Sequence, residues 1–188
     1  LSKRAEGTRL LKKGKFSAAA SEFEAGVESL WTLHALMKSG APNPAALAEV
    51  FEALHSCLLN HAQCSLKLGR YEDAAALCSR ILALPGEEDN VKARYRRGVA
   101  LAHLLQYVEA KEELRAACKL DPKSKEIRDE YERVVEAHAA QKRAEREAFG
   151  GMFEADMPVL DDNEAPTPSS RQEAEPANPF AGGKPFAV

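Results

Sequence analysis

With 188 residues, the chain is long enough for one domain with a real core and an appendage. Aromatic residues make up only 6% of it, whereas Ala, Leu, Glu, Lys and Arg are abundant, a mixture that favours helices over strands. The formal net charge of −3 gives no reason to expect a nucleic acid as partner. No apolar run reaches the roughly 18 residues that a membrane-spanning helix needs. We therefore expect an all-α protein that binds neither nucleic acid nor membrane.

Three stretches of the chain repeat one pattern. They are GTRLLKKGKFSAAASEF from Gly7, AQCSLKLGRYEDAAALC from Ala62 and GVALAHLLQYVEAKEEL from Gly98. Each opens on a small residue, has an aromatic residue nine positions later and an alanine three positions after that. The small residue lets two helices approach closely, and a turn before the aromatic residue makes each stretch a helical hairpin. One hairpin cannot bury its own apolar face, so we expect the three to stack.

The first two hairpins are separated by an insertion. Their aromatic residues, Phe16 and Tyr71, are 55 positions apart, whereas Tyr71 and Tyr107 are 36 apart. The extra segment of about 20 residues lies around 36–48 and contains the helix breakers of 39–44, and apolar residues at helical spacing flank it. We therefore expect the second helix of the first hairpin to be extended and the first helix of the second hairpin to start early.

This spacing places the repeats at about 1–38, 45–84 and 91–121, and Asp121-Pro122 ends the third. A capping helix is expected over 124–149, from about Lys125 to Phe149, with Gly150-Gly151 as its stop. Together these elements predict a domain over residues 1–149.

Residues 150–188 differ in composition from the rest. They hold seven acids, two bases and six of the ten prolines of the chain. Such a segment buries too little apolar surface to offset the entropy lost on ordering, so we expect an acidic, proline-rich disordered tail.

The four cysteines and five histidines form no pattern of metal binding or catalysis. Cys57, Cys64, Cys78 and Cys118 lie in helical patterns without a Cys-x-x-Cys pair, which favours reduced core residues in a cytosolic protein. No histidine stands at motif spacing from a nucleophile or carboxylate. The sequence therefore predicts no cofactor, no metal site and no catalytic residue.

The hairpin pattern resembles the tetratricopeptide repeat (TPR) family, whose unit is about 34 residues. The resemblance implies a right-handed solenoid of three hairpins whose first helices line a concave groove. The insertion, the stretches LKLGRYEDA and ARYRRG, and the terminal AQKRAEREAFGGMF also resemble the C-terminal TPR half of large immunophilins, the FKBP-type and cyclophilin-forty-type peptidyl-prolyl isomerases. This second resemblance covers about Lys3–Phe153. It implies a parent protein with an isomerase domain upstream of Leu1, while this chain itself is expected to be no enzyme.

One class of TPR domain carries in its groove a clamp for the C-terminal carboxylate of a partner that ends Glu-Glu-Val-Asp. When the chain is aligned on the small residue of each repeat, the clamp positions fall on Arg4, Thr8, Asn60, Lys92 and Arg96. The last three keep the residue types of the clamp, whereas Arg4 and Thr8 replace a Lys and an Asn, and Lys3 offers a substitute for Arg4. The two carboxylates of a terminal Asp need several donors at once, which Lys, Arg and Asn supply.

The resemblance implies a cytoplasmic co-chaperone adaptor that binds a heat-shock chaperone of the ninety- or seventy-kilodalton class. Two alternatives remain open: a fragment of a prolyl isomerase whose catalytic domain is upstream, and a TPR scaffold that binds internal peptides without reading a carboxylate. The final helix of such immunophilins is also credited with calmodulin binding. Here Lys142, Arg143 and Arg146 are interleaved with acids, so a solvated capping helix is the preferred interpretation. The sequence leaves the oligomeric state open.

Overall fold

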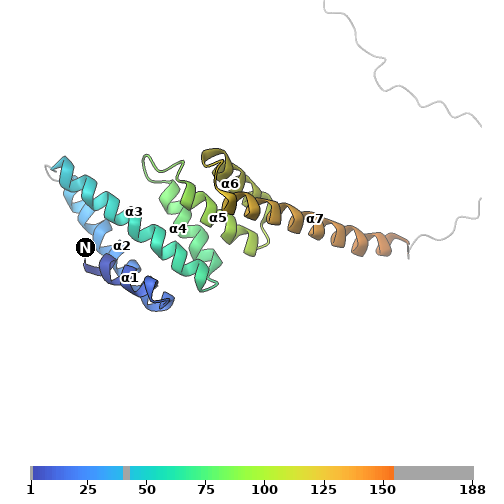
Figure 1. Ribbon diagram of the computed structural model, residues 1–188, viewed down its shortest axis with the longest axis horizontal. Helices are drawn as coiled ribbons and strands as arrows, with labels where there is room; N and C mark the ends of the chain where they lie inside the picture. The colour runs from blue at the N-terminus through green and yellow to red at the C-terminus, as the bar shows by residue number, and fades with distance from the viewer. Residues whose placement is uncertain (1, 40–42, 155–188) are drawn as a thin grey trace, which may run out of the picture. The chain divides into compact units, whose positions relative to one another are not determined.

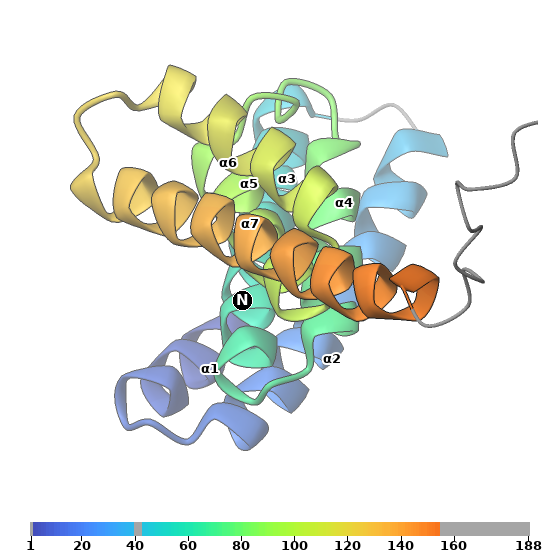
Figure 2. The ribbon, with the colours of Figure 1, turned by 90° about the vertical axis from the view of Figure 1, so that its right-hand side faces the viewer.

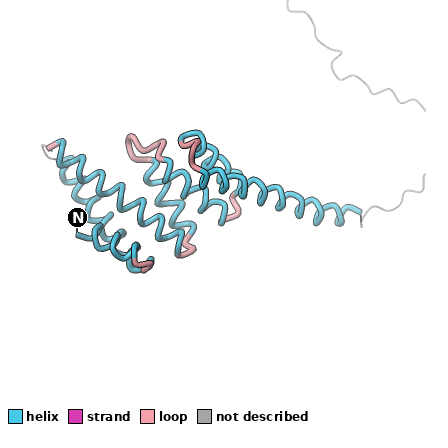
Figure 3. Tube along the Cα trace, in the orientation of Figure 1, coloured by secondary structure: helices cyan, strands magenta, loops and turns pink. Residues whose placement is uncertain are grey.

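The computed structural model describes residues 2–39 and 43–154, and every regular element in these ranges is an α-helix (Figure 1). The helices are α1 (Ser2–Lys12), α2 (Phe16–Ser39), α3 (Pro44–Lys67), α4 (Tyr71–Leu82), α5 (Val91–His103), α6 (Tyr107–Leu120) and α7 (Lys125–Glu154). Figure 3 shows the loops and turns that join the helices within the described ranges. Leu1–Phe149 form one compact unit, and Gly150–Val188 form a second, of which only the end of α7 is described. The predicted all-α stack of hairpins is confirmed, while the predicted disordered tail beyond Glu154 lies outside the described residues.

The helices pair into three hairpins, α1 with α2, α3 with α4, and α5 with α6. The first two are closed by turns in which Gly14 and Gly69 have φ angles of +71° and +72°. Glycine reaches this left-handed conformation without steric cost because it has no β-carbon. In the third turn Leu105 takes the same place with a φ of 62°. The three turns therefore share one backbone shape, although only two of them have a glycine there.

The small residue that opens each repeat lies where the two helices of the hairpin touch. A β-carbon added to Gly7 would lie 2.8 Å from the ring of Phe23, and one added to Gly98 would lie 2.6 Å from Cγ of Leu114. Ala62, at the same position of the second repeat, is fully buried. The close approach of the helices predicted from these residues is confirmed.

The insertion lengthens the helices on both sides of it. Helices α2 and α3 have 24 residues each, whereas α4, α5 and α6 have 12, 13 and 14. Asn43 caps α3, since its side chain accepts a hydrogen bond from the backbone nitrogen of Ala45 at 3.0 Å, and Pro44 occupies the first turn. The extension of the first hairpin and the early start of the second were both predicted and are confirmed.

Two clusters of buried apolar side chains hold the stack together. The larger cluster joins α1–α4 and the start of α5, and includes Phe23, Leu54, Leu58 and Ile81. The smaller cluster joins α5, α6 and α7 and consists of Leu101, Ala110, Leu114 and Val134. The boundary between the clusters runs through α5, whose Ala93 belongs to the first and Leu101 to the second.

Helix α7 packs against the third hairpin through its first half and continues beyond it (Figure 2). Val134 is buried against α5 and α6, and the rings of Tyr107 and His138 stack with centroids 5.8 Å apart. From Ala139 to Phe149 every side chain is exposed. The predicted stop at Gly150-Gly151 was wrong, because α7 runs through both glycines to Glu154. Glycine tolerates helical angles, and the exposed segment before it has no packing that imposes a left-handed cap.

None of the described helices combines the length and the hydropathy needed to cross a bilayer.

Candidate peptide-binding site

Helices α3 and α5, the first helices of consecutive repeats, lie next to each other and are tied together at the start of α5. Asn90 caps α5 by accepting a hydrogen bond from the backbone nitrogen of Ala93 at 2.9 Å. Its amide nitrogen donates to Oε2 of Glu87 at 2.8 Å and lies 3.1 Å from Nε2 of His55 on α3. The cap therefore fixes where α5 begins and how that end sits against α3.

Three of the five predicted clamp residues line one pocket between α3 and α5. Its volume is about 280 Å³, and its lining residues are His55, Ser56, Leu59, Asn60, Lys92 and Arg96. Asn60 and Arg96 hold the same position in consecutive repeats, so the stacking of α3 on α5 brings them together. Lys92 joins them because residues four apart share a face of a helix.

Arg96 is held in place by α3. Its guanidinium donates to the carbonyl oxygen of Leu59 at 2.6 Å and to Oε1 of Gln63 at 3.0 Å. Burial lowers the pKa of Arg96 below its ordinary value, yet the group stays a cation because arginine starts far above neutral pH. The positively charged guanidinium of Arg96 therefore lines the pocket in a fixed orientation.

Lys92 and Asn60 offer the remaining donors. The Lys92 side chain is exposed, and Asn60 is half-buried. Within the part of the chain that the structure describes, neither side chain has an ion pair or a side-chain hydrogen bond. An ammonium and an amide that line a pocket beside a fixed guanidinium can bind a carboxylate through several donors at once.

Lys92 and Arg96 also line a second pocket of about 500 Å³ that continues the groove from α5 towards α7. The other lining residues are Gln63, Leu66, Lys67, Tyr95, Val99, His103 and Glu126. The hydroxyl of Tyr95 donates to Oε1 of Glu126 at 3.0 Å, and burial, followed by this hydrogen bond, raises the pKa of Tyr95. The groove therefore extends past the clamp pocket and offers room for more than a terminal residue.

Arg4 and Thr8 do not line the pocket that holds the other three residues. Arg4 lines a pocket of about 130 Å³ between α1 and α2, together with Lys3 and Leu30. The Thr8 hydroxyl donates to the carbonyl oxygen of Arg4 at 2.8 Å, so its proton is used within α1. Lys3, the substitute for Arg4, pairs with Glu22 of α2 at 3.1 Å. The structure thus gathers the clamp residues of the second and third repeats but not those of the first.

Sequence reasoning missed two residues: His55, which lines the clamp pocket, and Gln63, which lines the neighbouring pocket and accepts a hydrogen bond from Arg96. Gln63 stands three positions after Asn60, on the same face of α3, and this spacing was a usable signal. His55 gave no such signal, because its contacts with Asn90 and Glu87 depend on a loop whose course the sequence pattern does not define.

Cysteines and potential metal ligands lie outside the clamp pocket as well. Among residues 2–39 and 43–154, no three potential metal ligands gather in one place. Cys57, Cys64 and Cys78 are buried and unpaired, and burial raises the pKa of the Cys78 thiol to about 12. These thiols are therefore protonated core residues near neutral pH.

The fold and the paired first helices define a TPR domain. The peptidyl-prolyl cis-trans isomerase FKBP42 of Arabidopsis thaliana is 32% identical to this chain over 148 residues, which are 79% of the chain and 39% of that protein. The C-terminal TPR-containing domain of a Plasmodium falciparum FK506-binding protein superposes with a TM-score of 0.65 at 26% identity, covering 76% of this chain and 89% of that one. No family model matches the chain.

A further structural neighbour is the first TPR domain of Spaghetti (RPAP3), solved with the HSP90 peptide SRMEEVD. It superposes with a TM-score of 0.55 at 24% identity over 74% of this chain and 92% of that one, a likeness that shows the fold. The chain is thus a TPR domain that resembles the C-terminal halves of large immunophilins. It spans about two fifths of the length of the curated relative that it matches.

Proposed function

We propose that this chain is a co-chaperone adaptor module that binds the C-terminal carboxylate of a heat-shock chaperone ending Glu-Glu-Val-Asp. The observation that carries the proposal is the meeting of Asn60, Lys92 and Arg96 in one pocket between α3 and α5. Any one of these residues alone would be ordinary helix surface or a polar contact between helices. Their convergence from two repeats gives the pocket a preference for an anion with several acceptor atoms.

The chemistry of the pocket matches the end of such a peptide. A terminal Asp brings two carboxylates, that of its side chain and that of the chain end. The Arg96 guanidinium is already oriented by Leu59 and Gln63, so little freedom is lost when a carboxylate binds to it. Lys92 adds a mobile positive charge, and Asn60 adds a neutral amide donor. The pocket towards α7 has space for the residues that precede the terminal Asp.

The comparisons support this proposal at the level of the module. Two relatives or neighbours are FKBP-type proteins, and the Spaghetti domain holds a peptide that ends in Glu-Glu-Val-Asp. The proposal extends this role to the present chain and takes the ninety- or seventy-kilodalton chaperone class as the partner. It places the module in the cytoplasm, where unpaired cysteines stay reduced.

The test is calorimetric titration of the 188-residue chain with a peptide ending Met-Glu-Glu-Val-Asp, as free acid and as C-terminal amide. We expect micromolar affinity for the acid, about −8 kcal/mol, and its loss on amidation. Lys92→Ala should weaken binding of the acid about tenfold, because it removes one charged donor. The matched control is Lys119→Ala on α6, which deletes the same charge at an exposed position outside the pocket.

The same titration separates the proposal from the alternative of a TPR scaffold that does not read a carboxylate. Equal binding of acid and amide would mean a TPR scaffold that reads internal peptide residues, and the carboxylate proposal would fail. Binding of neither peptide, or equal weakening by Lys92→Ala and Lys119→Ala, would also contradict it.

The other alternative, a fragment of a prolyl isomerase, concerns the parent protein. Because the chain spans 39% of its Arabidopsis relative, an isomerase domain in the parent is part of the proposal. We assign the TPR domain itself a docking role and no catalysis. A proline-containing peptide should therefore isomerise at its uncatalysed rate with this chain, and an acceleration would show that the assignment is wrong.

A further inference from the structure

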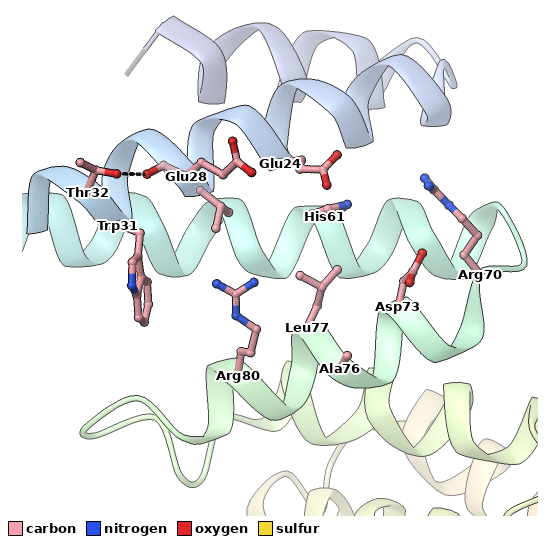
Figure 4. A pocket seen from close by; sticks show the side chains of 11 residues that line it. Glu24, Glu28, Trp31, Thr32, His61, Arg70, Asp73, Ala76, Leu77 and Arg80 are labelled. Carbon is pink, nitrogen blue, oxygen red and sulfur yellow. Dashed lines mark hydrogen bonds between the residues drawn. The ribbon is translucent and has the colours of Figure 1, made fainter. Parts of the chain in front are cut away.

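A separate cavity lies between the second helices of the first two repeats, α2 and α4, where the clamp helices α1 and α5 contribute nothing. Its volume is about 550 Å³, and His61 of α3 lies between its two walls (Figure 4). The lining residues are Glu24, Val27, Glu28, Trp31, Thr32, His61, Arg70, Asp73, Ala76, Leu77 and Arg80. We call this cavity the α2–α4 groove.

The α2 wall of the groove is acidic and ends in an aromatic ring. Glu24, Glu28 and Trp31 follow each other at i, i+4 and i+7, so they form one stripe along the helix. Among the described residues neither carboxylate has a hydrogen bond or an ion pair. Trp31 is 45% exposed, and the Arg80 guanidinium covers its ring at 5.6 Å from the centroid. A half-exposed tryptophan beside two unpaired acids is a surface that a basic, partly apolar partner would cover.

The exposed half of α7 carries the complementary stripe. Lys142, Arg146 and Phe149 also follow each other at i, i+4 and i+7, and Phe149 is 59% exposed. No salt bridge involves Lys142 or Arg146 within the described residues. Placed side by side in parallel, the two stripes set each acid opposite a base and the tryptophan opposite the phenylalanine.

We propose that the α2–α4 groove receives the exposed end of α7 from a second copy of this chain, with Glu24 and Glu28 facing Lys142 and Arg146 and with Trp31 packing on Phe149. This is the recognition of an amphipathic helix by a groove. Val27 and Leu77 give the groove an apolar lining. Arg80 of the groove, which lies beside Trp31, offers a guanidinium to Glu145 next to the basic stripe.

The occupant has to come from another molecule. Helix α7 packs on α5 and α6, and its free end leads away from α2 (Figure 1). Because groove and helix end are different surfaces, one contact leaves a groove free on one copy and a helix end free on the other. These two surfaces either meet each other and close a dimer or bind further copies, so association is expected to reach at least the dimer. The groove uses α2 and α4 rather than the clamp pocket, so peptide binding and self-association are compatible.

The test is sedimentation velocity of the 188-residue chain over a wide range of concentrations. We expect the weight-average mass to rise with concentration from the monomer to at least the dimer, and to fall when salt screens the charges. Glu24→Lys/Glu28→Lys and Lys142→Glu/Arg146→Glu should each weaken association roughly tenfold or more, since two attractive pairs become repulsive. The matched control, Glu109→Lys/Glu112→Lys on exposed positions of α6, should associate like the unchanged chain.

Mixing the two reversed variants is the decisive measurement. In the mixture, basic grooves meet acidic helix ends and acidic grooves meet basic helix ends, so association should return. A chain that stays monomeric at every concentration would overturn the proposal. So would reversed variants that associate as the unchanged chain does, or a mixture that stays as monomeric as its components.

Discussion

The guanidinium of Arg96 on α5 donates to the carbonyl oxygen of Leu59 on α3 over 2.6 Å, so one side chain links the first helices of two repeats. Oε1 of Gln63 accepts a second hydrogen bond from the same guanidinium at 3.0 Å. Arg96 thus presents its charge to the pocket in an orientation that α3 determines, and Gln63 acts on a bound carboxylate through Arg96 as a positioning residue.

Arg96→Lys should weaken binding of a carboxylate-terminated peptide about tenfold, which is about 1.4 kcal/mol. Lysine keeps the charge but lacks the planar fork that reaches Leu59 and Gln63 together. Gln63→Ala should give a smaller loss, because Arg96 keeps its bond to Leu59. Calorimetric titration checks both, with Arg97→Lys as the control, since Arg97 pairs with Glu113 instead. Full affinity in Arg96→Lys would show that the orientation of the charge is unimportant.

Gly98→Ala should destabilise the domain by about 1–3 kcal/mol, the usual effect of overpacking. The new β-carbon would stand 2.6 Å from Cγ of Leu114 and 3.3 Å from the backbone oxygen of Ala110, so the helices of the third hairpin must separate. Gly26→Ala is the matched control. Its β-carbon meets only ordinary contacts at 3.5 Å, so the better helix propensity should stabilise the domain by about 1 kcal/mol. Urea unfolding measures both, and equal effects of the two substitutions would contradict the packing argument.

Leu105→Gly should stabilise the domain by about 0.5–1 kcal/mol. Leu105 has a φ of 62°, a left-handed conformation that costs a residue with a side chain about 1–2 kcal/mol, and its side chain is exposed. Part of the gain is lost to the greater freedom of glycine in the unfolded chain. Gly69→Ala, which places a side chain at a φ of +72° in the preceding hairpin, should change thermal stability in the opposite direction. A loss of stability in Leu105→Gly would mean that this side chain packs better than its exposure indicates.

The stability of the domain should fall on acidification through His61. Burial lowers the pKa of His61 below its ordinary value of 6.5, so the folded chain binds this proton less readily than the unfolded chain. The contribution of neutral His61 to the free energy of unfolding is complete above pH 6.5. It is lost as the pH falls from 6.5 towards the pKa of His61 in the folded chain. Thermal unfolding at about pH 7.5 and about pH 5.5 should show a larger loss in the unchanged chain than in His61→Gln. The same pH dependence in both proteins would assign the effect to other groups.

The hairpins were predictable because their signals are local. Gly7, Ala62 and Gly98 recur at a fixed distance from an aromatic residue, and steric contact between helices demands small residues there. The end of α7 was not predictable in this way. Gly150-Gly151 would have ended the helix if packing had favoured a left-handed cap, and the surroundings of an exposed segment cannot be inferred from its glycines.

The part of the candidate site that depends on the stacking of repeats could be predicted from the sequence. Asn60, Lys92 and Arg96 meet because equivalent positions of consecutive repeats are neighbours in a solenoid. Arg4 stands at a clamp position of the repeat pattern but lines a different pocket, together with Gly26 and Leu30 of α2. The α2–α4 groove was not predicted from the sequence, because its walls come from two helices that are distant in the chain.

The boundary between the two hydrophobic clusters runs through α5, between Ala93 and Leu101, and Arg96 stands at that boundary. A peptide held by Asn60 on one side and by Lys92 and Arg96 on the other would act as a staple across the joint between the two clusters. Local opening of the third hairpin, which hydrogen exchange detects as loss of protection in α5 and α6, would then be suppressed while the ligand is bound. Occupancy of the pocket would thereby also stabilise the packing of α7, whose first half rests on α5 and α6.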